Sequence, residues 1–176
     1  MTIRPATSDD ARGIATVKIA SWREGYAHIL PAEYLAALDL EKQERRFFED
    51  IVAGGHFLVA EEHGAVAAFS LWQEFLAPNA VQTDWPHKNT VASLYVHPDF
   101  YRQGLGTALL RACANKALER GHEGMMIGVF RDNVRAKNFY LKLGAELFKA
   151  GWFAVDGIKY PEEILIFTRG SEIFLP

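Results

Sequence analysis

The chain has 176 residues, of which 49% are hydrophobic and 12% aromatic, and it carries a formal net charge of -3. This length fits one domain of roughly 150 residues, so we expect a single domain over residues 1–176, and the composition excludes a disordered chain. The one cysteine, Cys113, excludes an internal disulfide and makes the cytoplasm the expected location. The nearly apolar run Ala65–Trp72 is far shorter than the ~20 residues that cross a bilayer, and Met1–Asp10 has no apolar signal-peptide stretch, so neither membrane spanning nor export is expected.

Positive charge is concentrated in one part of the chain. Residues Lys88 to Lys149 hold ten Lys and Arg against five Asp and Glu, although the whole chain is weakly acidic. This segment favours anionic ligands, with charges scattered over a solvated surface as the alternative. The chain lacks the overall basic excess of a nucleic-acid binder, and the basic segment lacks interleaved stacking aromatics, so no nucleic-acid partner is expected.

The first part of the chain predicts one strand and three helices. Ser8-Asp9-Asp10 is a good N-cap cluster, Pro31 suits the start of the second helix, and Gly54-Gly55 ends the third. The predicted elements are a strand at Thr2–Pro5, a helix after Asp10 that carries Ile14, Val17, Ile19 and Trp22 at roughly helical spacing, and helices at Ala32–Leu38 and Glu41–Val52.

The rest of the chain alternates strands and helices around a mixed sheet. Glu62-His63-Gly64 suits a turn between two antiparallel strands, and Phe75–Lys88 is a loop of a length typical of a functional flap. Gly124–Phe130 is nearly all apolar, which indicates a strand covered on both faces. The predicted strands are His56–Glu61, Ala65–Trp72, Thr90–Val96, Gly124–Phe130, Leu147–Val155 and Tyr160–Arg169, and the predicted helices are Gly104–Arg120 and Asn133–Leu143.

A glycine-containing turn between a strand and a helix is the sharpest chemical signal. Gly104 and Gly106 leave room for a ligand at the backbone, and the first turn of the helix offers N–H groups without internal partners beside a positive dipole end. A phosphate group satisfies both features. The stretch is not GxGxxG, because Leu109 occupies the third glycine's place, and it is not GxxxxGK[ST]. The alternative is that Gly104 only permits a tight turn.

This turn resembles the signature of the GNAT-type N-acetyltransferases, which move an acetyl group from acetyl-CoA to an amine. The family pattern, Gln or Arg, two residues, Gly, any residue, then Gly or Ala, departs here at its first position, which is Tyr101. Asn133-Val134-Arg135-Ala136-Lys137-Asn138-Phe139-Tyr140 resembles the second family block, N-x-x-A-x-x-F-Y. The resemblance covers most of the chain and implies one GNAT domain: a mostly antiparallel twisted sheet of six to seven strands with a splayed parallel pair, flanked by about four helices.

The same resemblance implies the roles of individual residues. Tyr140 is expected to act as the general acid beside the CoA sulfur, and the main-chain N–H of Val96 to face the thioester carbonyl. The residues expected to bind acetyl-CoA are Leu94, Tyr95, Val96, Arg102, Gln103, Gly104, Leu105, Gly106, Thr107, Asn133, Ala136 and Tyr140.

The general base and the acceptor site are less clearly marked. Many relatives carry a glutamate at the position of Thr90, so Glu74 is our preferred base, acting through water. The alternatives are that Glu74 is a solvated surface charge, that His97 is the base, or that no dedicated base exists. Trp22 and Tyr26 share a helix face and resemble part of a bacterial GNAT segment that shapes the acceptor pocket, with a core role as the alternative.

We therefore expect an N-acetyltransferase that uses acetyl-CoA as acyl donor and acetylates a primary amine of a small molecule or peptide. The alternative is a non-catalytic acyl-CoA-binding sensor. No metal is expected, because the histidines show no paired ligand spacing. No membrane partner is expected, and dimerisation, common in the family, is left open.

Overall fold

The computed structural model describes residues 1–75 and 85–175, so the middle of the predicted flap lies outside the described residues. The chain divides into two compact units, one formed by Met1–Trp72 with Ser93–Ala112 and the other by Gln73–Ala92 with Cys113–Pro176. Within the described residues, no helix is long and apolar enough to cross a membrane.

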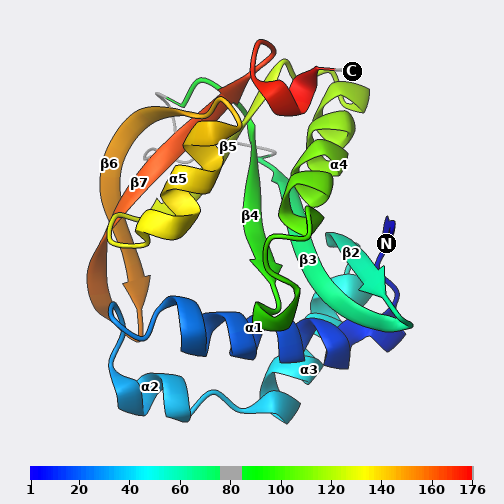
Figure 1. Cartoon of the computed structure of the whole chain (residues 1–176), viewed down its shortest axis with the longest axis vertical. Coiled ribbons are helices and arrows are strands. Elements are labelled where there is room, and N and C mark those ends of the chain that lie inside the picture. Colours follow the sequence, from blue (N-terminus) through cyan, green and yellow to red (C-terminus); the bar gives the residue numbers. More distant parts are fainter. Residues whose placement is uncertain (76–84, 176) are drawn as a thin grey trace. The chain divides into compact units, whose positions relative to one another are not determined.

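The described residues form seven strands and five α-helices, close to the predicted ranges (Figure 1). The strands are β1 (Thr2–Pro5), β2 (His56–Glu62), β3 (Ala65–Glu74), β4 (Asn89–Val96), β5 (Gly124–Phe130), β6 (Glu146–Val155) and β7 (Ile158–Thr168). The helices are α1 (Ala11–Gly25), α2 (Ala32–Ala36), α3 (Leu40–Val52), α4 (Leu105–Glu119) and α5 (Val134–Lys142), with short 3-10 helices η1 (Ser8–Asp10), η2 (Pro98–Phe100) and η3 (Glu172–Phe174).

The strands belong to one mixed sheet, with the order β1-β2-β3-β4-β5-β7-β6. The pairs β1–β2, β2–β3, β5–β7 and β6–β7 are antiparallel, whereas β4 and β5 run parallel, with Thr90 opposite Met126 and Val91 opposite Ile127. This arrangement confirms the predicted mostly antiparallel sheet with one parallel pair.

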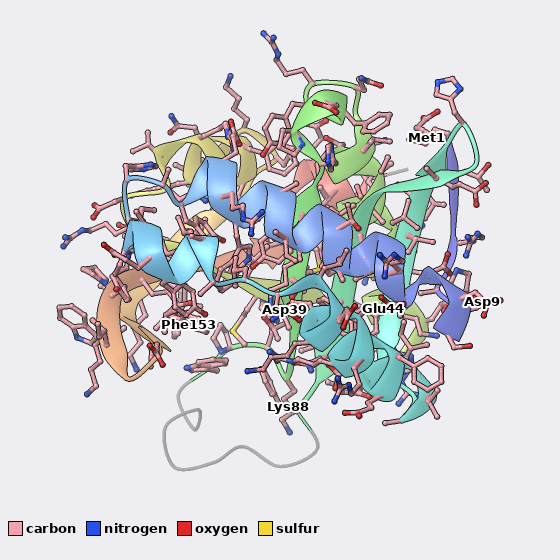
Figure 2. All side chains as sticks on the ribbon, turned by 90° about the horizontal axis from the view of Figure 1, so that it is seen from below. Met1, Asp9, Asp39, Glu44, Lys88 and Phe153 are labelled. Carbon is pink, nitrogen blue, oxygen red and sulfur yellow. The ribbon has the colours of Figure 1, made fainter. Side chains whose placement is uncertain are left out.

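In the first unit, α1 and α3 pack on the β2–β3 hairpin. The ring of Phe47 on α3 makes edge contacts with Phe57 and Phe69 at 5.8 and 5.4 Å between centroids, and Ile14 of α1 is fully buried in the same cluster. Figure 2 shows α1 and α3 lying side by side, with Glu44 on α3; its carboxylate pairs with Arg12 of α1 at 2.7 Å. The apolar residues whose spacing predicts α1, which are Ile14, Val17, Ile19 and Trp22, are all buried.

The second helix ends earlier than predicted, at Ala36 rather than Leu38. The guanidinium of Arg23, on α1, donates hydrogen bonds to the carbonyls of Leu35, Ala36 and Leu38. These carbonyls are satisfied by a side chain from another helix, so the chain turns into α3 without a further helical turn. Arg23 is distant in sequence, and the local pattern gives no sign of it.

The entry to α1 is held by a partly buried charge network. Asp10, 7% exposed, accepts hydrogen bonds from the backbone N–H of Thr7 at 2.8 Å and from both terminal nitrogens of Arg4 at 2.7 and 2.8 Å. Arg4 also pairs with Glu61 of β2 at 3.0 Å. The hydrogen bonds from Arg4 hold the pKa of Asp10 below its usual value of 3.8.

Replacing Asp10 by Asn is expected to destabilise the fold by about 1–3 kcal/mol at pH 7, because charged hydrogen bonds are lost at a buried site. Because the folded-state pKa lies below the unfolded one, this stabilisation is complete above the unfolded-state pKa. It is lost as the pH falls through the folded-state value, below 3.8. Urea unfolding at several pH values measures the difference, with Asp9→Asn on the exposed neighbour as the control. An Asp10→Asn protein as stable as the control at pH 7 would contradict the network's role.

In the second unit, α5 covers one face of the β5–β7–β6 sheet (Figure 1). Lys137 of α5 pairs with Glu163 of β7 at 2.6 Å, and the ring of Tyr140 contacts that of Phe167 at 6.4 Å. Successive strand residues point to opposite faces, so Glu163 and Phe167 face α5, whereas Glu162 points to the other face.

Candidate functional site

The predicted anion-binding turn enters α4 with its backbone exposed. Arg102 and Gly104 have positive φ angles of 62° and 84°. The carbonyl of Gly104 accepts the first helical hydrogen bond, from Ala108 at 3.0 Å. The N–H groups of the first helical turn, at Leu105, Gly106 and Thr107, therefore have no acceptor within the helix. They lie at the positive end of the helix dipole, which is an arrangement suited to a phosphate.

A non-glycine residue at positive φ is uncommon, and Arg102 is one. Its side chain is exposed and packs into no core, so the strained backbone conformation of Arg102 is set by the course of the turn. Leu105, next to Gly104, is 1% exposed and packs with Leu109 against small residues of β2 and β3. This buried anchor fixes the turn to the first unit.

Tyr101, the departure from the family pattern, has a defined partner in the structure. Its hydroxyl donates a 2.7 Å hydrogen bond to the carboxylate of Glu24, in the last turn of α1. The position where relatives carry Gln or Arg therefore ties the turn to α1. The sequence marks Tyr101 as unusual, but it does not reveal Glu24 as its partner.

At the end of β4, some backbone N–H and carbonyl groups point away from β3. The N–H of His97 donates to the carbonyl of Ala67 on β3 at 2.8 Å. Because backbone groups of successive strand residues point to opposite sides, the N–H and carbonyl of Val96 point away from β3. The Val96 carbonyl accepts from the hydroxyl of Ser21 on α1 at 2.7 Å. This orientation leaves the Val96 N–H available to a ligand on that side.

Trp22 and Tyr26 lie in an aromatic cluster beside the end of β4. Trp22 is 8% exposed, and its ring centroid lies 5.2 Å from that of Tyr26 and 6.4 Å from that of Tyr95. Burial raises the pKa of the Tyr95 hydroxyl, and a hydrogen bond with Tyr26 lowers it by a smaller amount. Trp22 therefore contributes mainly packing, whereas Tyr26 is half-buried at the rim of the cluster.

In the second unit, the residues of the second family block share α5 but differ in their roles. The side-chain oxygen of Asn133 caps the helix by accepting a 3.2 Å hydrogen bond from the N–H of Ala136. Tyr140 is 6% exposed, and its ring contacts those of Phe139 and Phe167. Asn133 and Ala136 thus form the cap of the helix, and Tyr140 packs between neighbouring rings.

Glu74, the predicted base, is engaged in ion pairs at the end of β3. Its carboxylate lies 2.8 Å from a guanidinium nitrogen of Arg120 and 2.6 Å from His122 Nε2. The hydrogen bonds from Arg120 and His122 lower the pKa of Glu74, and the one from Arg120 has the larger effect. Both partners follow α4 far along the sequence, and nothing in the local pattern predicts them.

Thr90, at the position of the relatives' glutamate, and His97, the alternative base, both have structural partners. Thr90 donates from its hydroxyl to the carbonyl of Met126 on β5 at 3.0 Å, which joins the parallel pair. His97 Nδ1 accepts a 3.4 Å hydrogen bond from the N–H of Asp99 and so caps η2. Across residues 1–75 and 85–175, no group of three or more His, Cys, Asp or Glu side chains is arranged to hold a metal ion.

Comparisons with known proteins agree with this fold. The model of the acetyltransferase (GNAT) family matches residues 19–145. The chain is 26% identical over 162 residues to the uncharacterized N-acetyltransferase YuaI of Bacillus subtilis, with 92% of this chain and 90% of that protein covered. It is 29% identical over 153 residues to the L-amino acid N-acyltransferase MnaT of Escherichia coli, with 82% and 78% covered.

A solved structure shows the same fold. The PaiA N-acetyltransferase of Thermoplasma acidophilum, in complex with coenzyme A, superposes with a TM-score of 0.74 at 22% identity, covering 96% of this chain and 99% of that one. The protein described here belongs to the acetyltransferase (GNAT) family, and it is an acyltransferase.

Proposed function

We propose that the protein transfers an acetyl group from acetyl-CoA to a primary amine of a small molecule or peptide. The observation that carries the proposal is the exposed turn at the start of α4, where main-chain N–H groups without helical partners meet a positive dipole end. CoA carries a diphosphate that fits such a site. The coenzyme A bound to the PaiA protein supports the choice of donor.

In this proposal the chain's backbone does much of the binding. The N–H groups from Arg102 to Thr107 hold the diphosphate, and Leu94, Tyr95 and Val96 pair with the pantetheine arm as with an added strand. The Val96 N–H, which points away from β3, donates to the thioester oxygen as negative charge develops on it. Asn133 and Ala136 contribute the fixed start of the helix that carries Tyr140.

The chemical step is direct attack by a neutral amine on the thioester carbonyl carbon. The new C–N bond forms, the C–S bond breaks, and the departing thiolate takes a proton from the Tyr140 hydroxyl. The nitrogen, which becomes positively charged on attack, releases one proton to solvent, and the Tyr140 phenolate takes one back from solvent, so the products are an amide and free CoA. A phenol suits this task because the sulfur leaves more readily as a neutral thiol than as a thiolate.

The sequence predicts Glu74 as the base for this step, and its contacts in the structure weaken this prediction. Its ion pairs lower its pKa, which makes the carboxylate a weaker proton acceptor. We expect Glu74→Gln to lower kcat/KM for the amine far less than the ~100-fold or more that the loss of a general base costs. Initial rates of thiol release at pH 7 measure the effect, with thermal unfolding to check the fold. A loss of that size would restore Glu74 as the base.

The acceptor class is proposed from the likeness to the L-amino acid N-acyltransferase MnaT and from the aromatic cluster of the first unit. Tyr26, at the rim of the cluster, is the residue we assign to contact the acceptor, with Trp22 packed behind it. Free amino acids with apolar side chains are therefore the first acceptors to test, followed by alkyl and aryl amines and by peptide N-termini.

Thiol release from acetyl-CoA in the presence of this amine panel tests the proposal. Release that depends on both acetyl-CoA and one class of amine, together with an acetylated product seen by mass spectrometry, supports it. Tight binding of acetyl-CoA without thiol release across the panel supports the alternative, a sensor without turnover.

A further inference from the structure

A carboxylate that the sequence does not single out lies on the open face of the second unit's sheet. Glu162 of β7 stands opposite Phe130 of β5 and Gly151 of β6. Its side chain points to the face opposite α5, because its neighbour Glu163 is the residue that pairs with Lys137 of that helix. Glu162 and Glu163 are thus adjacent in sequence and separated by the sheet.

The carboxylate of Glu162 extends over β5, into the space beside Gly128. A Cβ atom on Gly128 would overlap a carboxylate oxygen of Glu162. Gly128 shares this face, since it lies two residues before Phe130 on the same strand. Phe130 is the last residue of β5, so the carboxylate lies near the carboxyl end of a parallel strand, where α/β sheets commonly bind ligands.

Glu162 lacks the partners that hold the other inward-facing carboxylates. In the described part of the chain no hydrogen bond or ion pair reaches the carboxylate of Glu162, whereas Asp10 is bound by Arg4 and Glu163 by Lys137. Burial of the side chain raises the pKa of Glu162 to about 7. A partly buried carboxylate without a cation is costly to retain for stability alone, which indicates that a ligand supplies the cation.

The surroundings favour a cationic group over other ligands. The ring of Phe130 contacts those of Phe153 and Tyr160 at 5.7 and 6.0 Å between centroids, and these three residues share the face of Glu162. Aromatic faces attract ammonium groups and pack against apolar carbon. Phe153, on β6 of the β6–β7 hairpin, is labelled in Figure 2.

We infer that Glu162 is a catalytic residue that binds the ammonium group of the acceptor and takes its proton. The inference rests on the proposed function and adds the base that the acetyl transfer needs. One proton passes from the nitrogen to a Glu162 oxygen and then to solvent, and the freed electron pair of the amine attacks the thioester carbonyl. A carboxylate that titrates near neutrality is well matched to this transfer.

The test is the pH dependence of kcat/KM for an acceptor found in the amine panel. The wild type should lose activity as the pH falls through about 7. Glu162→Gln should lower kcat/KM by ~100-fold or more and remove that limb. Within the described second unit, the other titratable groups on this face are Tyr160 on β7, Glu146 and Lys149 on β6, and His87, which packs over Gly124 of β5.

Two further variants separate a catalytic role from a structural one. Asp156→Asn makes the same charge change in the β6–β7 turn, at a φ of 50° that Asn adopts readily, and should keep wild-type kinetics. Gly128→Ala displaces the carboxylate without removing it and should lower kcat/KM as well. Calorimetry should show unchanged acetyl-CoA affinity in all three variants, which also shows that they fold.

The outcomes are distinguishable. A wild type that turns over, with a Glu162→Gln protein that keeps its rate and its limb near pH 7, overturns the role of Glu162 and leaves the proposed function intact. A wild type that does not bind acetyl-CoA overturns both.

Discussion

Replacing Tyr140 by Phe is expected to lower kcat ~100-fold or more while the affinity for acetyl-CoA stays unchanged, because only the hydroxyl that protonates the departing thiolate is removed. The ring of Tyr140 is 6% exposed and packs against Phe139 and Phe167, so Phe keeps the packing. Steady-state thiol release and calorimetric titration with acetyl-CoA measure the two quantities separately.

The neighbouring ring offers a control for this variant. Phe139→Leu, on the half-buried preceding position of α5, disturbs the same helix without removing a proton donor and should cost far less in kcat. A second readout is the dependence of kcat on the leaving group. A thioester whose thiol is more acidic needs less help from an acid, so its kcat should fall less when the Tyr140 hydroxyl is removed. A Tyr140→Phe enzyme with wild-type kcat would remove Tyr140 from the mechanism.

The second large effect is expected at Gly104. Replacing it by Asp should weaken acetyl-CoA binding by ~10-fold or more relative to replacement by Asn, because a negative charge then faces the diphosphate. A Cβ at Gly104 would meet no atom within 4 Å, and both Asn and Asp tolerate its φ of 84°. The two variants therefore match in size and backbone strain, and they differ in charge.

Calorimetric titration of both Gly104 variants at low and high salt gives the measurement. The gap between Asp and Asn should shrink as salt rises, because the repulsion is between exposed charges. Equal affinities at low salt would place the diphosphate elsewhere.

The sequence predicts the order of elements because their boundaries are local. Gly64, Gly121 and Gly144 all have positive φ angles, at the turns where the patterns place breaks. The turn at Gly104 and the helix that carries Tyr140 are also recognisable, since each depends on closely spaced residues. The expected single domain stays a prediction.

What the sequence could not predict depends on contacts between distant segments. The cap on α2 comes from Arg23, and the bond that anchors Tyr101 comes from Glu24, more than 70 residues earlier in the chain. Glu74 looks like a free carboxylate until α4 brings Arg120 to it. Glu162 is one of two adjacent glutamates, and only the structure shows that the other, Glu163, is the one that pairs with α5.

The most direct test of the central claim, that the turn at Gly104 binds the diphosphate of CoA, is a calorimetric comparison of CoA with pantetheine on the folded protein. We predict saturable binding of one CoA per chain and much weaker binding of pantetheine, which carries the thiol arm but no diphosphate. Equal affinity for the two ligands, or no heat with millimolar CoA, would contradict the account.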